Sequence, residues 1–161
     1  GDIIEIRKTP IAPLETSDEL MARLAQIAAP LCADTVRAIA AGTAPRTPQE
    51  QEKATYAPML SKEESPIDWN QPARFVVDHV RGLVPWPVAT ARLGGTDFKI
   101  YRVEYTDQKT DLAPGSLVAL TKKGLLVACA GGDVLLVREL QAQGGKRMDA
   151  ADYFRGHPIT I

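Results

Sequence analysis

The sequence of 161 residues is poor in the residues that build metal sites and disulfide frameworks. It has only two cysteines and two histidines, and no CxxC pair, which excludes the usual zinc-binding spacings. No apolar run approaches the roughly 18 residues that a membrane-spanning helix needs. The N-terminal residues lack the basic and apolar regions of a signal peptide and an initiator Met, so we expect a fragment or a processed product.

Both cysteines stand in apolar surroundings, Cys32 in Ala-Pro-Leu-Cys-Ala and Cys129 in Leu-Val-Ala-Cys-Ala. Because a free cysteine packs as a small hydrophobic residue, we expect both side chains to be buried thiols. Free thiols persist in reducing compartments, so the cysteine content predicts a cytoplasmic protein.

Neither sign of charge dominates the whole chain, since 19 Lys and Arg stand against 20 Asp and Glu. Residues 1–70 contain 7 basic and 11 acidic residues, a balance of −4, whereas residues 71–161 contain 12 basic and 9 acidic residues, a balance of +3. A modestly basic C-terminal part suits contact with a polyanion such as a nucleic acid. A solvated domain without such a partner explains the same balance.

The first 42 residues predict one strand and two helices. Asp2–Lys8 is rich in isoleucine and favours a short strand. Thr16 and Glu19 have the spacing of a capping box, and apolar residues follow at helical spacing: Leu20, Leu24, Ile27 and Leu31. Pro30 would cost about 3 kcal/mol inside a helix, so we expect it in the first turn of a second helix that ends at Gly42. This segment is too small to fold alone, and we interpret it as the end of a Rossmann-like α/β domain.

Residues 43–69 interrupt every periodic pattern with prolines and glutamates. This composition favours a semi-rigid, solvated connector, and the stretch is longer than most loops within compact domains. We therefore predict an interdomain linker here, followed by a second domain at residues 70–161.

Two helices are predicted in the second domain. The first has Asn70 as its cap and Pro72 in its first turn, and it ends at Gly82. Its predicted buried side consists of Ala73, Phe75, Val76 and Val80. The second helix covers Asp149–Gly156.

Five short strands are predicted between these helices, separated by glycine-containing turns. They are Val88–Arg92, Asp97–Tyr105, Ser116–Leu120, Leu125–Ala130 and Val134–Arg138. Five short strands with flanking helices favour a closed, OB-like barrel, because closure hides the edge strands. The expected fold class is therefore α+β, mainly β.

A series of short phrases stands in a fixed order along nearly the whole chain. They are Thr9-Pro10-Ile11, Ala54-Thr55-Tyr56-Ala57-Pro58, Ser61-Lys62-Glu63-Glu64, Ile67-Asp68-Trp69, Val80-Arg81-Gly82, Pro85-Trp86-Pro87, Pro114-Gly115 and Gln141-x-x-Gly144-x-Lys146-Arg147-Met148. No single phrase is specific, but together the sequence resembles methionyl-tRNA formyltransferase. Formyltetrahydrofolate dehydrogenase and the sugar-nucleotide formyltransferases share part of this layout, and a structural domain of such an enzyme is the alternative.

The resemblance implies the C-terminal part of an enzyme that formylates initiator methionyl-tRNA with formyltetrahydrofolate as donor. The family's chemistry uses an Asn-x-His pair and an Asp. Asn70 is the only Asn and has no His two residues later, so we expect no catalytic residue, no cofactor site and no activity in this chain alone. We interpret His79 and His157 as packed or surface residues. Met59 stands where the family often has Lys.

The expected partner is initiator methionyl-tRNA, bound by a monomer. Lys and Arg bind phosphates, and those in loops or at the ends of elements reach outward. The candidate nucleic-acid-binding residues are Lys62, Arg81, Lys122, Lys123, Lys146 and Arg147. Each has a structural alternative: the lysines protect a strand edge, or Arg81 stabilises the end of its own helix. We expect Trp69 and Trp86 to pack at corners, with stacking on a base as the alternative.

A third hypothesis is a free-standing oligonucleotide-binding domain with an N-terminal extension. It predicts that the extension is ordered without a partner, whereas an orphaned strand and helices would expose their apolar sides to proteolysis.

Overall fold

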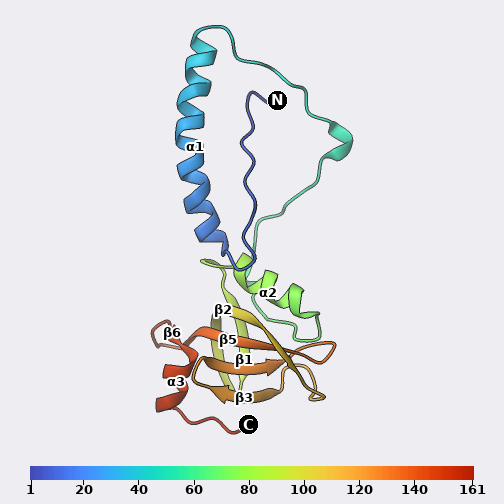
Figure 1. Cartoon of the computed structure of the whole chain (residues 1–161), viewed down its shortest axis with the longest axis vertical. Helices are drawn as coiled ribbons and strands as arrows, with labels where there is room; N and C mark the ends of the chain where they lie inside the picture. Colours follow the sequence, from blue (N-terminus) through green and yellow to red (C-terminus); the bar gives the residue numbers. More distant parts are fainter. The chain divides into compact units, whose positions relative to one another are not determined.

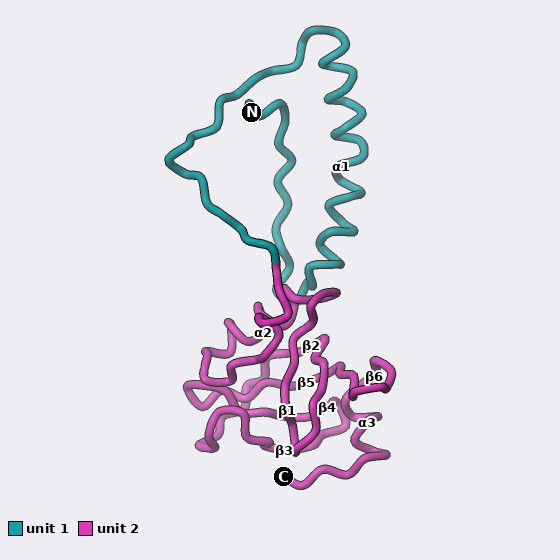
Figure 2. Tube along the Cα trace, turned by 180° about the vertical axis from the view of Figure 1, so that it is seen from behind, with its two compact units in different colours: residues 1–59 teal, residues 60–161 magenta.

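A computed structural model describes residues 1–161 of the chain. The chain divides into two compact units, Gly1–Met59 and Leu60–Ile161 (Figure 2). All of the buried hydrophobic core belongs to the second unit. None of the helices combines the length and the apolar character that crossing a lipid bilayer requires.

The first unit has one long helix, α1 (Ser17–Ala40), where the sequence predicted two (Figure 1). Pro30 lies inside this helix. The two-helix prediction is wrong because a second helix needs a new, costly nucleus, whereas an interior proline removes one backbone hydrogen bond. The capping box is confirmed, and the Thr16 N–H donates to the Glu19 carboxylate at 2.9 Å. The helix ends just before Gly42, whose φ is 69°, as predicted.

The predicted strand Asp2–Lys8 is wrong, because this segment has no partner strand along most of its length. One bridge joins it to the rest of the unit, where Ile3 and Thr47 exchange backbone hydrogen bonds of 2.8 and 2.9 Å. The predicted burial of Cys32 is also wrong, because α1 buries none of its residues. Cys129, in the second unit, is buried as predicted.

The proline-rich stretch between α1 and α2 has little regular structure. It contains two short 3-10 helices, η1 (Gln51–Lys53) and η2 (Lys62–Glu64). Prolines and solvated glutamates account for the lack of longer elements. The division of the chain into residues 1–42, 43–69 and 70–161 stays a prediction.

The second unit is built on an antiparallel sheet with the spatial order β1-β2-β5-β4-β3. Its strands are β1 (Ala89–Leu93), β2 (Thr96–Lys109), β3 (Leu117–Thr121), β4 (Gly124–Ala128) and β5 (Asp133–Ala142). The five predicted strands are thereby confirmed. A sixth strand, β6 (Met148–Asp149), pairs with β5 and was missed, because two residues give no alternating pattern.

Closure of the sheet into a barrel is not confirmed. Strands β1 and β3 stand at the two ends of the strand order and share no pairing. The segment Ser65–Pro72 bonds to both sides of the sheet instead: the Thr90 N–H donates to the Ser65 carbonyl at 2.7 Å, and the Ala130 N–H donates to the Trp69 carbonyl at 3.0 Å. Trp69 is buried, which confirms that it is a packing residue.

Helix α2 (Ala73–Gly82) contacts β2 and β5. Its buried residues are Ala73, Val76, Val77 and Val80. Phe75 is 63% exposed, so its predicted burial is wrong, because it lies outside the helical stripe that faces the sheet. Asn70 is not the cap as predicted; Pro72 holds that position, and the Asn70 N–H donates to the Asp68 carboxylate at 3.0 Å. The end of the helix is as predicted.

Helix α3 (Ala150–Gly156) follows β6 directly and lies beside it (Figure 1), as predicted for this segment. Phe154 is buried and meets Phe98 of β2 edge to face, with 5.8 Å between the ring centroids. Tyr153 meets the same ring at 5.2 Å. Such aromatic pairs stabilise beyond the area they bury, so α3 is fixed to the sheet near its β5–β6 end.

Candidate nucleic-acid interface

The turn between β3 and β4 presents two free cations. Lys122 and Lys123 are exposed, and neither forms an ion pair. The Lys123 N–H donates to the Thr121 hydroxyl at 3.1 Å, and its carbonyl accepts a hydrogen bond of 2.7 Å from Nη1 of Arg138. The backbone of the turn is thus held from two sides while both ammonium groups stay available to a ligand.

Gly124 places this turn close to β5. Its φ is 143°, and a Cβ at this position would lie 2.1 Å from the carbonyl oxygen of Val137. No L side chain fits at that distance, so glycine is required after the two lysines. The structure therefore requires the glycine of the Lys-Lys-Gly sequence, and the two lysines supply the charge.

The turn between β5 and β6 contains one free and one paired cation. Lys146 is exposed and forms no ion pair. Arg147 donates from Nε to the Glu139 carboxylate at 2.8 Å, and its guanidinium carbon lies 4.5 Å from the centroid of the Tyr101 ring. Arg102 approaches the same carboxylate at 3.9 Å. Arg147 is therefore occupied by protein partners, and Lys146 is the cation that this turn offers to solvent.

Tyr101 also holds the β5–β6 turn through a relay of hydrogen bonds. Its hydroxyl donates to Oε1 of Gln141 at 2.7 Å, and Nε2 of Gln141 donates to the Gly145 carbonyl at 2.9 Å. Sequence reasoning missed this arrangement, because Tyr101 and Gln141 are 40 residues apart. The available sequence signal is the alternation of apolar and polar residues along β2, which places Lys99 and Tyr101 on one outward face.

The register of the sheet brings the two cationic turns together. Strands β4 and β6 pair with the same edge of β5 in succession, because Leu125 lies opposite Val137 and Asp149 lies opposite Glu139. The β3–β4 turn therefore adjoins β6, which the β5–β6 turn leads into. The register thus places Lys122 and Lys123 just before β4, and Lys146 and Arg147 just before β6, along the same edge of β5.

The two other candidates are not part of that edge cluster. Arg81, at the end of α2, is partly buried and binds the Asp78 carboxylate at 2.7 Å. Lys62 is exposed in η2, next to Glu63, whose pKa is lowered chiefly by a hydrogen bond from the Ser61 side chain. For Arg81 the geometry favours the structural alternative.

Trp86 differs from Trp69 in its surroundings. More than half of its side chain, 53%, is exposed, so the prediction that it packs is wrong. Val84 and Val88, two residues before and after Trp86, are buried and pack at this corner in place of the ring. The exposed ring stacks on no other aromatic side chain and on no cation of the chain, so its surroundings do not indicate a function for it.

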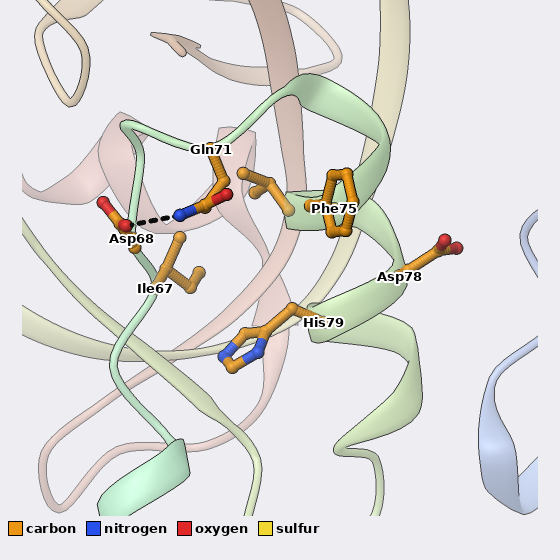
Figure 3. A pocket seen from close by; sticks show the side chains of 7 residues that line it. Ile67, Asp68, Gln71, Phe75, Asp78 and His79 are labelled. Carbon is orange, nitrogen blue, oxygen red and sulfur yellow. Dashed lines mark hydrogen bonds between the residues drawn. The ribbon is translucent and has the colours of Figure 1, made fainter. Parts of the chain in front are cut away.

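A cavity of 310 Å³ lies between α2 and the residues before it (Figure 3). The Asp68 carboxylate accepts a hydrogen bond of 3.0 Å from Nε2 of Gln71, which, with the bonds from Asn70, lowers the pKa of Asp68. The ring of His79 points toward Ile67, and its Nε2 is buried without a partner. No lysine or arginine lines this cavity, so it does not extend the cationic edge.

Comparison with known proteins assigns the chain to a family. A family model described as formyl transferase, C-terminal domain, matches residues 59–158. The chain belongs to this family. It is 42% identical over 160 residues to the methionyl-tRNA formyltransferase of Moorella thermoacetica, covering 99% of this chain and 51% of that protein. It is 38% identical over 161 residues to that of Trichlorobacter lovleyi, covering 100% and 50%. The predicted resemblance is confirmed, and the chain spans about half the length of these curated relatives.

Solved structures of two other proteins share the fold. HypX from Aquifex aeolicus matches with a TM-score of 0.71 and 17% identity, over 96% of this chain and 28% of HypX. An N-formyltransferase from Helicobacter canadensis matches with a TM-score of 0.65 and 14% identity, over 85% of this chain and 49% of that one. At these identities the likeness concerns the fold alone.

Proposed function

We propose that this chain is the C-terminal, tRNA-binding part of a methionyl-tRNA formyltransferase. The relatives that match it over nearly its whole length have that name, at 42% and 38% identity. In the complete enzyme, a formyl group would pass from formyltetrahydrofolate to the methionyl amine of initiator tRNA. The task of this part would be to hold the tRNA.

One observation supports the holding role above all: the two turns that contain the free lysines lie along one edge of β5. Lys122, Lys123 and Lys146 have no protein carboxylate to neutralise them. Phosphates would take that place and release their counterions, which makes binding depend on salt. Arg147 positions Lys146 in this proposal, Lys62 is a secondary contact, and Arg81 has the structural role that its pair with Asp78 indicates.

The chemistry belongs elsewhere in the complete enzyme under this proposal. The one asparagine, Asn70, donates through Nδ2 to Asp68 at 3.1 Å and has a proline, not a histidine, two residues later. An Asn-x-His pair is thus not formed by these residues. We place the formyl donor, formyltetrahydrofolate, outside this chain and expect no formyl transfer by the chain alone.

The proposal also includes the curvature of the sheet, the oligomeric state and the cellular location of the protein. The register between β2 and β5 shifts at three places, and the segment Ser65–Pro72 bonds to β1 and to Ala130, just after β4. Both features support an OB-like curvature for the open sheet. We also propose a monomer, and a location in a reducing cytoplasm, which fits the exposed free thiol of Cys32. The alternative, a spacer domain in a metabolic formyltransferase, predicts no affinity for tRNA beyond that of any weakly basic domain.

The test is a titration of labelled initiator tRNA with the 161-residue chain at several salt concentrations, beside an elongator tRNA. We expect salt-dependent binding with little preference between the two. The double change Lys122→Glu and Lys123→Glu should weaken binding and flatten its salt dependence, by about 0.7 to 0.9 in the log–log slope for each phosphate that the variant no longer binds.

A matched control is the double change Lys8→Glu and Arg46→Glu, which alters the charge equally at exposed, unpaired residues of the first unit. It should leave affinity and slope unchanged. No binding of the unmodified chain at low salt would contradict the proposed function.

A further inference from the structure

A second cavity, of 350 Å³, opens beside the β5–β6 turn. Its lining comes from three neighbouring strands and the start of the turn: Thr90, Asp97, Phe98, Lys99, Gln141, Ala142, Gln143 and Gly144. Thr90 lies opposite Lys99 and Lys99 opposite Gln141, so these residues form one row across β1, β2 and β5. The cavity is therefore set on three paired strands.

The lining offers one free cation, one free amide and an apolar wall. Lys99 is exposed and forms no ion pair, and Gln143 is exposed with no hydrogen bond from its side chain. Ala142 supplies apolar surface, whereas the Phe98 ring is only 2% exposed and belongs to the core. The oxygen and the nitrogen of the Gln141 side-chain amide already form hydrogen bonds, to Tyr101 and Gly145, so this side chain forms a fixed wall of the cavity.

The charges around the cavity favour an anion. Lys146 and Arg147 follow two and three residues after Gly144, on the same turn. The nearby carboxylates are engaged: Asp97 lies 3.4 Å from Arg92, and Glu139 binds Arg147. A phosphate at Lys99 would thus meet a cation without an unpaired carboxylate beside it.

We propose that this cavity receives one unstacked nucleotide of a single-stranded RNA segment. Lys99 would bind its phosphate, the Gln143 amide would hydrogen-bond the edge of the base, and Ala142 would contact the base. The volume lies at the lower end of the about 300–1,000 Å³ typical of small-ligand sites, which suits one nucleotide. A base can enter only when splayed out of a stack, so a single strand and not a duplex is the ligand. The inference rests on the proposed function, because it specifies where tRNA touches this chain.

The first test compares the complete chain with Lys99→Ala, Gln143→Ala and a matched control, Lys109→Ala. Lys109 lies on the same strand, is also exposed, and pairs with Asp133 away from the cavity. Lys99→Ala should weaken tRNA binding several-fold and lower the salt slope by about 0.7 to 0.9, the value for one phosphate. Gln143→Ala should weaken binding roughly two- to tenfold without changing the slope, because only a neutral hydrogen bond is removed. The control should change neither.

The second test identifies the ligand class by nuclear magnetic resonance. An unstructured hexauridylate should shift the Gly144 backbone amide and the Gln143 side-chain amide, whereas a blunt RNA duplex of six base pairs should not. Equal shifts with both RNAs would overturn the assignment to a single strand. If the changes at Lys122 and Lys123 weaken tRNA binding while Lys99→Ala binds tRNA as well as the control does, the cavity does not bind a nucleotide. In that case the proposed function stands. If tRNA does not bind at all, both are overturned.

Discussion

The guanidinium of Arg147 lies over the ring of Tyr101, with 4.5 Å between the guanidinium carbon and the ring centroid. Glu139 binds the same guanidinium from β5, through hydrogen bonds of 2.5 and 2.8 Å. An arginine held by an aromatic ring and a carboxylate is poorly placed to exchange them for a phosphate. The contacts therefore fix the β5–β6 turn, and the neighbouring Lys146 is the residue that the turn offers to a ligand.

The first prediction separates the two contributions of Tyr101. Tyr101→Phe loses the 2.7 Å hydrogen bond to Gln141 and should lower the free energy of unfolding by about 1 kcal/mol. Tyr101→Leu also loses the cation–π contact and should lower it by a further 0.5–1 kcal/mol, roughly. Urea denaturation measures both. Equal stability of the two variants would show that the stacked guanidinium contributes nothing.

The second prediction concerns the glycine after the two lysines. Gly124→Ala should lower the free energy of unfolding by about 3 kcal/mol or more, because a Cβ 2.1 Å from the Val137 carbonyl oxygen adds a clash to a strained backbone. Gly95→Ala is the control: its φ is 82°, but no atom lies within 4 Å of the added Cβ. That change should cost only about 1 kcal/mol. Similar losses in urea denaturation would mean that the turn is not pressed against β5.

The third prediction distinguishes the two thiols. Burial raises the pKa of the Cys129 thiol, and the Asp133 carboxylate adds to the effect, so little of the reactive thiolate is present. Cys32 is exposed on α1. With a thiol-reactive disulfide reagent near pH 8, one thiol should react quickly and the other only after denaturation. Cys32→Ser should abolish the fast phase, and a fast phase that persists would place Cys129 at the surface.

Local sequence signals predicted most elements of the second unit. Short apolar strands between glycine turns, and the helix α3 near the end of the chain, have signals within a few residues, so they could be predicted from the sequence. Pro30 shows the limit of such reasoning, since its local cost does not say whether the helix continues through it. Cys32 shows another, because apolar neighbours in sequence do not guarantee that anything covers them in space.

The candidate site was predictable as a set of charges but not as an arrangement. Lys122 and Lys146 could be identified because cations at glycine turns point outward. Their meeting along one edge of β5 depends on the register of β4 and β6, which no local pattern encodes. The cavity at Lys99 likewise needs β5, which is distant in the sequence from β1 and β2, to pair with β2. Long-range pairing thus decides which of the predicted cations act together.

The last prediction follows from the carboxylate of Asp68. Its pKa is lowered, first by the hydrogen bond from Gln71 and then by those from Asn70, so the unfolded chain takes up its proton at a higher pH than the folded one. The stabilisation from this group is therefore complete above the unfolded pKa, about 3.9, and disappears as the pH falls through the lower folded value. Asp68→Asn removes the titration, so between pH 5 and pH 2, approximately, its free energy of unfolding should fall less steeply than that of the unmodified chain. The same change at Asp111, which is exposed and accepts no hydrogen bond, controls for the removal of one charge. Urea denaturation across this pH range measures how steeply the free energy of unfolding depends on pH. If Asp68→Asn shows the same slope as the unmodified chain, the hydrogen bonds from Gln71 and Asn70 do not hold the carboxylate in solution.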